Sequence, residues 1–186
     1  ADRFIIGSAV GAAGLAHYAV ATQLAQPLHA FAAAAASVVF PKVGRAMAQG
    51  DPARVQRLIV RGVLLLGAAT TSIALVLLVF RVEILTLWLG ADVAAAAAPT
   101  LGLLLIAYWL LSLGVLPHFI LLGLGRMRFV ALSNLFAGAL TLVAMLLLVG
   151  PLGIVGIAMA RIIYGIALLI NYEPLRRFWK THAQTV

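Results

Sequence analysis

Long apolar stretches, separated by short polar or glycine-containing segments, run along nearly the whole chain. Because a helix needs about 20 apolar residues to cross about 30 Å of hydrocarbon, each such stretch predicts one membrane span. Complete spans are predicted at 16–40, 62–80, 99–122, 129–149 and 152–172. The first of these ends at Pro41, and residues 2–7 look like the last turns of another apolar helix. We therefore expect an all-α, polytopic transmembrane helical bundle of about five full spans plus a partial one.

The segments between the spans carry turn and loop signals. Residues 8–15 are small and predict a link, whereas residues 42–61 are polar and predict a loop at the membrane interface. Residues 81–98 form a third connection, in which the alanine run 94–98 favours a helix. Only Gly150-Pro151 separates the last two spans, which predicts a tight antiparallel hairpin.

The composition excludes a water-soluble globular fold. Hydrophobic residues make up 65% of the chain and charged residues only 10%, so there are too few polar side chains to cover a soluble surface. A net charge of +8 would suggest nucleic acid as a partner of a soluble protein, but here the basic residues lie in loops and tail, so we expect membrane lipids and no nucleic acid. The absence of cysteine excludes disulfides and thiol chemistry.

The distribution of basic residues predicts the orientation in the membrane. Most of the 13 lysines and arginines lie in alternate connections or in the tail, namely Lys42, Arg45, Arg54, Arg57, Arg61, Arg126, Arg128, Arg176, Arg177 and Lys180. By the positive-inside rule this side faces the cytoplasm. We expect residues 1–175 to form the bundle and residues 176–186 to form a basic cytoplasmic tail. The opening of the chain lacks a signal peptide, and the sequence is interpreted as a fragment of a larger protein.

Two helix faces carry candidate binding residues. At 100° per residue, Tyr18, Thr22, Gln26 and His29 fall within an arc of about 80° on the first complete span. Polar groups at this depth need partners, so the face is expected to meet other helices or a wet cavity. Hydrogen bonding between helices and a role in transport both remain open for this face.

The last span carries a full charge near the middle of the bilayer, at Arg161. Tyr164 and Asn171 share its face within an arc of about 80°. An arginine at this depth is costly unless it faces a cavity or a partner, and its guanidinium forks toward phosphate oxygens. Arg161 is therefore either an anchor for an anionic substrate or one member of a buried ion pair, for example with Asp2.

Other features predict packing rather than chemistry. Asn134, Gly138, Thr141 and Met145 make a stripe of small and polar residues on the fourth span, and Gly153, Gly156 and Ala160 suggest a close approach between helices. The four histidines are scattered over separate segments, and hydrolase, metalloprotease and phosphate-loop motifs are absent from the sequence. We therefore expect neither an enzyme nor a metal site nor a cofactor.

An ordered set of short motifs resembles the C-terminal half of bacterial polysaccharide flippases, the O-antigen and exopolysaccharide exporters of the MOP superfamily. Multidrug MATE exporters and the lipid II flippase belong to the same superfamily. The matching residues are Asp2-Arg3, Gly14 with Tyr18, Phe40-Pro41, Gly50-Asp51, Leu89-Gly90, Gly123-Leu124-Gly125-Arg126, Asn134 and the run from Gly153 to Ala158.

This resemblance implies two helical bundles facing each other across a cavity, of which this chain supplies the second and lacks the N-terminal one. It implies transport of an undecaprenyl-pyrophosphate-linked oligosaccharide across the bacterial inner membrane by alternating access. Arg161 and Arg3 are then candidates to meet the pyrophosphate, and Asp2 is a candidate ion-coupling carboxylate. A MATE-type multidrug exporter and a non-transporting membrane scaffold remain as alternatives.

Overall fold

The computed structural model describes the backbone of residues 2–182 and the side chains of residues 5–178. Every regular element in this part of the chain is a helix, as the sequence predicts. The elements are α1 (Asp2–Ala9), α2 (Gly11–Ser37), α3 (Val39–Ala48), α4 (Pro52–Val79), α5 (Arg81–Leu89), α6 (Ala91–Gly123), α7 (Met127–Leu168), the short 3₁₀ helix η1 (Leu169–Asn171) and α8 (Tyr172–His182).

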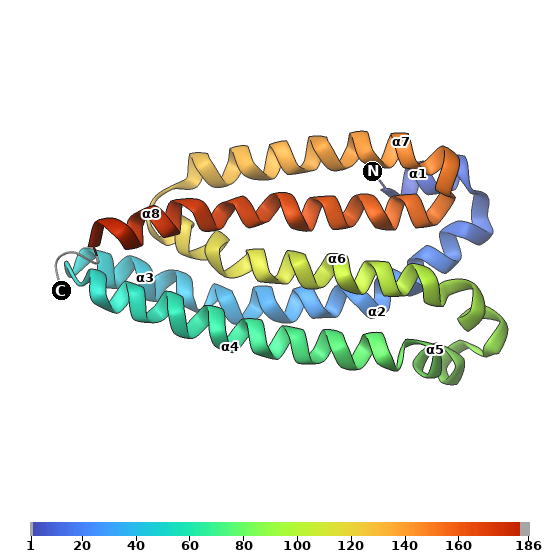
Figure 1. The fold of residues 1–186 in the computed structure, drawn as a ribbon, viewed down its shortest axis with the longest axis horizontal. Coiled ribbons are helices and arrows are strands. Elements are labelled where there is room, and N and C mark those ends of the chain that lie inside the picture. The colour runs from blue at the N-terminus through green and yellow to red at the C-terminus, as the bar shows by residue number, and fades with distance from the viewer. Residues whose placement is uncertain (1, 183–186) are drawn as a thin grey trace.

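Four helical stretches in the described residues are long and apolar enough to cross a membrane: Gly11–Ala48, Pro52–Val79, Ala91–Gly123 and Met127–Phe178. The last stretch contains two helices, because Gly153 has the non-helical angles φ 54° and ψ −131°. At this point α7 turns back on itself, so that its two halves run side by side in opposite directions (Figure 1). The predicted hairpin is thus confirmed, and the five predicted spans correspond to these four stretches.

Small glycines permit the tight hairpin. Gly153 lies in the left-handed half of backbone space, which side chains other than glycine rarely enter. A Cβ atom on Gly156 would overlap the carbonyl group of Leu148, so the two halves of α7 approach each other backbone to backbone. The close approach predicted from Gly153 and Gly156 is therefore present in the structure.

Three of the predicted connections are more helical than expected. Residues 8–15 are helical except for a sharp turn, where Gly11 has φ 81°. Residues 42–61 contain most of α3 and the first part of α4, and residues 81–98 contain α5 and the start of α6. The helix expected for the alanine run 94–98 is confirmed, whereas the loop expected at 42–61 was wrong, because amphipathic segments have helical propensity even between membrane spans.

The turn before α4 shows how the sequence sets these boundaries. Gly50 has φ 67°, Asp51 is the N-cap, and Pro52 occupies the first turn of the helix. The Asp51 carboxylate accepts a hydrogen bond of 2.8 Å from the backbone N–H of Arg54. Pro41, by contrast, does not end a helix as expected. It lies in the first turn of α3, where its missing N–H costs no hydrogen bond, and the break falls earlier, at Val38.

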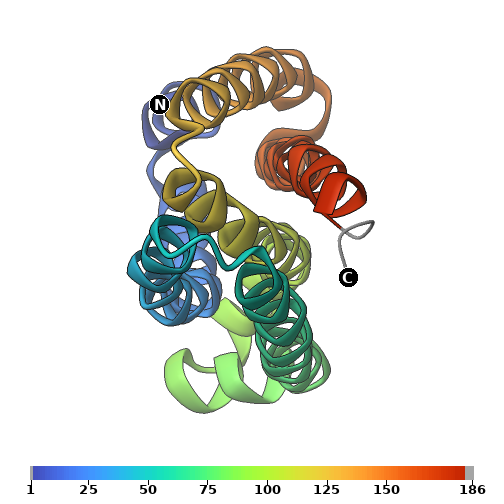
Figure 2. The same ribbon diagram turned by 90° about the vertical axis from the view of Figure 1, so that its left-hand side faces the viewer.

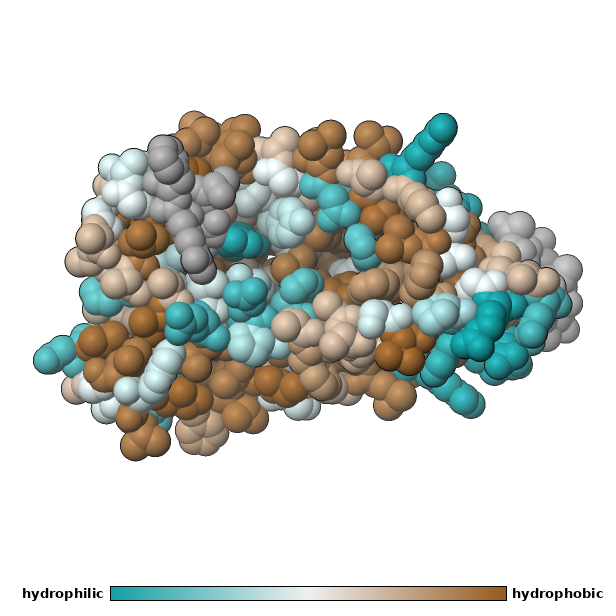
Figure 3. Space-filling model, turned by 180° about the vertical axis from the view of Figure 1, so that it is seen from behind, coloured by the Kyte–Doolittle hydropathy of each residue, from teal (hydrophilic) through white to brown (hydrophobic). Residues whose placement is uncertain are grey.

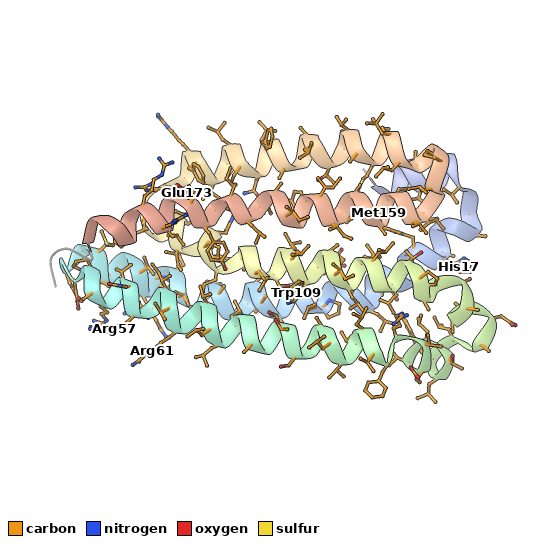
Figure 4. All side chains as sticks on the ribbon, in the orientation of Figure 1. His17, Arg57, Arg61, Trp109, Met159 and Glu173 are labelled. Carbon is orange, nitrogen blue, oxygen red and sulfur yellow. The ribbon has the colours of Figure 1, made fainter. Side chains whose placement is uncertain are left out.

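Helix α6 lies at the centre of the bundle, between α2, α4 and α7 (Figure 2). Its buried side chains belong to two apolar cores. One core includes Ile6, Leu104 and Ile157, and the other includes Val43, Leu116 and Ile120. The indole Nε1 of Trp109 on α6 also donates a hydrogen bond of 2.9 Å to Thr71 Oγ1 on α4 (Figure 4). Because α6 is central, the polar side chains Thr100 and Ser112 along it are buried among other helices.

The two ends of the bundle differ in charge. The turns before α4 and before α7 lie at the same end as α8, whereas α5, the α1–α2 turn and the α7 hairpin lie at the other end (Figure 1). The basic residues of these turns and of α8 therefore gather at one end, as the alternation of charge predicts. Large aliphatic side chains such as Leu65 and Leu75 are exposed along the sides, which suits a protein embedded in lipid.

Candidate functional site

A cavity of about 250 Å³, open on one side, lies between α2, α6, both halves of α7 and η1. The polar residues that line it come from every one of these elements, and they are His29, His118, Asn134, Tyr164 and Asn171. Its apolar lining includes Leu111 and Phe119. A concave site with a few convergent polar groups on an apolar wall is the usual form of a small-molecule binding site.

Hydrogen bonds hold the polar wall of the cavity in place. Asn171 of η1 is only 1% exposed. Its Oδ1 accepts a hydrogen bond of 3.0 Å from the hydroxyl of Ser133 on the first half of α7. The hydroxyl of the next residue, Tyr172, donates to the carbonyl oxygen of Leu113 on α6 at 2.8 Å. Asn134 donates to the carbonyl oxygen of Val130, one turn earlier in its own helix. The Ser133–Asn171 and Tyr172–Leu113 bonds fix the η1 segment against α7 and α6, and thereby position Asn171.

Two buried polar atoms at the cavity lack a hydrogen-bond partner in the described part of the chain. They are Nδ2 of Asn171 and Nδ1 of His29. Buried polar groups in native structures are nearly always satisfied, and an exception needs an explanation. Both residues line the cavity, and a small side-chain rotation would bring either atom to a water molecule or a polar ligand there. The cavity is therefore suited to a hydrogen-bonding occupant rather than an apolar one.

Arg161 lies beside this cavity. Ala107, Tyr108, Leu111, Arg161 and Tyr164 surround a small pocket that is too tightly packed to hold a water molecule, and Leu111 and Tyr164 also line the cavity. The Tyr108 ring also lies 6.5 Å, between centroids, from the ring of His29. The polar groups thus follow one another along the bundle, from the guanidinium in the middle of the second half of α7 to Asn171 near the basic end, with closely packed side chains around Arg161.

The structure brings together several residues that the sequence placed on separate spans. His29, Tyr164 and Asn171 line the same cavity, with Arg161 next to it. Tyr18 is buried, but it belongs to the apolar core nearer the hairpin end. Gln26 is exposed and does not line the cavity. The side chains of Asp2 and Arg3 lie outside the described residues.

Three residues of the site were not selected from the sequence. The sequence shows His118 only as one of four scattered histidines, its spacing assigns Asn134 to a packing seam, and no pattern in it marks Tyr108. A usable signal existed for His118, because Leu111, Gly114 and His118 recur at helical spacing and lie on one face of α6. Nothing in the spacing shows that this face of α6 meets His29 on α2.

The acidic side chains that the structure describes lie away from the cavity. Of the acidic side chains described, Asp51 and Glu173 belong to the basic end, whereas Glu83 and Asp92 lie near the other end; none of them lines the cavity or the Arg161 pocket. The described residues also contain no group of three or more histidine and acidic side chains suited to a metal ion.

Seen from behind, hydrophilic residues gather along the middle of the molecule, where its surface is hollowed between apolar regions (Figure 3).

An apolar helical bundle with an internal polar cavity has the architecture of a polytopic membrane transporter. The comparison with known families agrees. The MatE family model matches residues 1–145, and the chain belongs to this family, within the MOP superfamily. Members of the family are transporters and not enzymes. None of the curated proteins and none of the solved structures compared with the chain matches it.

The family match covers α1 to α6 and most of the first half of α7. It includes His29, His118 and Asn134, whereas Arg161, Tyr164 and Asn171 follow it in the sequence. The lining of the cavity therefore comes partly from the matched region and partly from the residues that follow it.

Proposed function

We propose that this chain forms one bundle of a transporter that moves an anionic, lipid-linked oligosaccharide across the bacterial inner membrane. The observation that carries the proposal is the position of Arg161, within the apolar bundle and beside a polar cavity. A pyrophosphate linked to a glycan cannot cross about 30 Å of hydrocarbon without a shielded polar path and a compensating cation. Arg161 supplies the cation, and its planar guanidinium suits bidentate contact with phosphate oxygens.

The polar cavity contributes the second part of the path. Imidazole, phenol and amide groups at His29, Tyr164 and Asn171 offer donors and acceptors to sugar hydroxyls or phosphate oxygens. With a volume of about 250 Å³ the cavity holds a headgroup fragment and not a whole oligosaccharide. The proposal therefore includes a second, N-terminal bundle of the same transporter, which would complete the path and rock against this one. The basic end would face the cytoplasm.

A MATE-type multidrug exporter is the second candidate, and membership of the MatE family supports it equally. The favourable observation is the pair Tyr108 and Tyr164 at the Arg161 pocket, because aromatic faces attract organic cations. Against it, the permanent positive charge of Arg161 beside the cavity disfavours a cationic drug.

The test uses a bacterial strain that lacks its own O-antigen flippase. Expression of the transporter containing this chain is expected to restore surface polysaccharide, measured by gel analysis of surface glycan. The same cells are tested for resistance to cationic drugs. Restored glycan with unchanged drug resistance supports the flippase, whereas drug resistance without glycan supports the exporter. If the protein is abundant in the membrane but restores neither surface glycan nor drug resistance, the result favours a scaffold.

A more local prediction concerns the unpartnered amide of Asn171. Asn171→Ala is expected to lower transport several-fold, because it removes the Nδ2 donor at the cavity together with the hydrogen bond from Ser133. Ser133→Ala is the matched control, since it removes the same hydrogen bond but leaves the amide in place. It is expected to cost about 1 kcal/mol of stability or less and to leave transport near normal. Equal losses of transport in the two variants would contradict a role in substrate binding.

A further inference from the structure

A second and larger pocket lies outside the polar cavity, between α4 and the η1–α8 segment. Its volume is about 620 Å³, within the range of about 300 to 1,000 Å³ that is usual for ligand sites. The lining is mostly aliphatic, and consists of Ile59, Val60, Val63, Leu64, Leu169, Tyr172, Glu173, Leu175 and Arg176. It shares no residue with the lining of the polar cavity or of the Arg161 pocket, so it is a separate site.

The polar groups of this pocket are distributed unevenly. The hydroxyl of Tyr172 already donates to the Leu113 carbonyl oxygen on α6, and Glu173 forms a 2.9 Å ion pair with Arg177. Arg176 is exposed at the same site, and within the described residues it has neither an ion pair nor a hydrogen bond to another side chain. The pocket therefore combines an apolar interior with one available guanidinium.

The surrounding charge favours an anionic occupant. The end of the bundle that contains α8 also carries Lys42, Arg45, Arg54, Arg57, Arg61, Arg126, Arg128 and Arg177, against the described acids Asp51 and Glu173. Clusters of basic residues at the end of membrane helices attract anionic lipid headgroups. From this end, the pocket continues along one helical turn of α4, from Val60 to Leu64, into the apolar part of the bundle.

We propose that this pocket binds an anionic phospholipid, with its phosphate at Arg176 and one acyl chain between α4 and α8. The pocket matches both parts of such a lipid. Its aliphatic lining suits the acyl chain, and the basic residues at its membrane-interface end suit the phosphate. The bound lipid fills the space between α4 and α8 and joins them. It is a structural lipid, distinct from the substrate that passes through the polar cavity.

The test measures lipid retention by native mass spectrometry of the purified protein, titrated with phosphatidylglycerol or phosphatidylcholine of identical acyl chains. One phosphatidylglycerol molecule is expected to bind several-fold more tightly than phosphatidylcholine. Arg176→Gln should weaken phosphatidylglycerol binding about fivefold, the contribution expected of one basic residue near a membrane surface. Val63→Trp should weaken retention of either lipid at this site, because the larger side chain occupies the wall of the pocket against which the acyl chain would lie.

Arg61→Gln is the matched control for charge. Arg61 lies at the same end on α4 but is not part of the pocket lining, and its side chain points away from α8, as does that of Arg57 (Figure 4). The Arg61→Gln variant should bind phosphatidylglycerol as tightly as the unmodified protein does. Equal retention of the two lipids, or equal weakening by Arg176→Gln and Arg61→Gln, would overturn the proposal. Displacement of phosphatidylglycerol by an equimolar polyprenyl phosphate would also overturn it, by assigning the pocket to the substrate tail. The comparison of Arg176→Gln with Arg61→Gln tests the proposal even if Val63→Trp fails to fold.

Discussion

Arg161→Ala is expected to reduce transport roughly 30-fold or more while leaving the protein in the membrane at normal abundance. The expected size follows from the loss of a charged, partly desolvated hydrogen-bonding group, which costs about 2–5 kcal/mol when its ligand is left without a partner. The measurement is glycan export in the flippase-deficient strain, with the amount of protein in isolated membranes determined in parallel. Arg161→Lys should be intermediate, because it keeps the charge but loses the bidentate geometry.

Arg81→Ala provides a control with the same change of side chain and charge. Arg81 begins α5 near the other end of the bundle, and its guanidinium donates to the carbonyl oxygen of Leu78 at 2.6 Å. It lines neither the cavity nor the Arg161 pocket, so export should remain near normal. If both alanine variants lose export equally, Arg161 has no special role. If Arg161→Ala lowers abundance as much as export, its role is structural and the binding proposal fails.

The membrane bundle and the hairpin were predictable because they depend on local properties of the sequence. A long uncharged stretch is long enough to cross a bilayer whatever its neighbours are, and Gly150-Pro151 followed by Gly153 permits a reversal wherever it occurs. Helix boundaries were less predictable. The segment 42–61 is polar, yet its amphipathic pattern forms α3, whereas Asp51 and Pro52 do mark the start of α4 correctly.

The candidate site was predictable only where it follows the spacing along one helix. Tyr164 and Asn171 share a face with Arg161, and the structure places all three at adjoining pockets. His118 and His29 line one cavity only because α6 packs against α2, and that pairing depends on the tertiary arrangement. Gln26 illustrates the same limit from the other side. Gln26 and His29 fall within the same arc of about 80° on the helix, yet His29 lines the cavity and Gln26 is exposed.

Gly156→Ala is expected to destabilise the protein by about 1–3 kcal/mol or more, through overpacking at the α7 hairpin. The added methyl group would overlap the carbonyl group of Leu148, which belongs to the backbone of a helix and cannot rotate away as a side chain could. The second half of α7 must therefore shift, and it carries Arg161 and Tyr164. A lower unfolding temperature of the purified protein, followed by size-exclusion chromatography after heating, is the measurement.

Gly138→Ala on the first half of α7 separates this steric effect from the general effect of replacing a helical glycine. A Cβ atom at Gly138 meets no atom within 4 Å, so the change should be neutral or should stabilise the helix by up to about 1 kcal/mol. The two glycines are thus expected to respond with opposite signs although the substitution is identical. Equal unfolding temperatures for Gly156→Ala and the unmodified protein would contradict the backbone contact, whereas a fall with both variants would point to a property of the whole helix. Because the contact at Gly156 sets where the second half of α7 lies against the first, its loss should also reduce transport in the protein that remains folded.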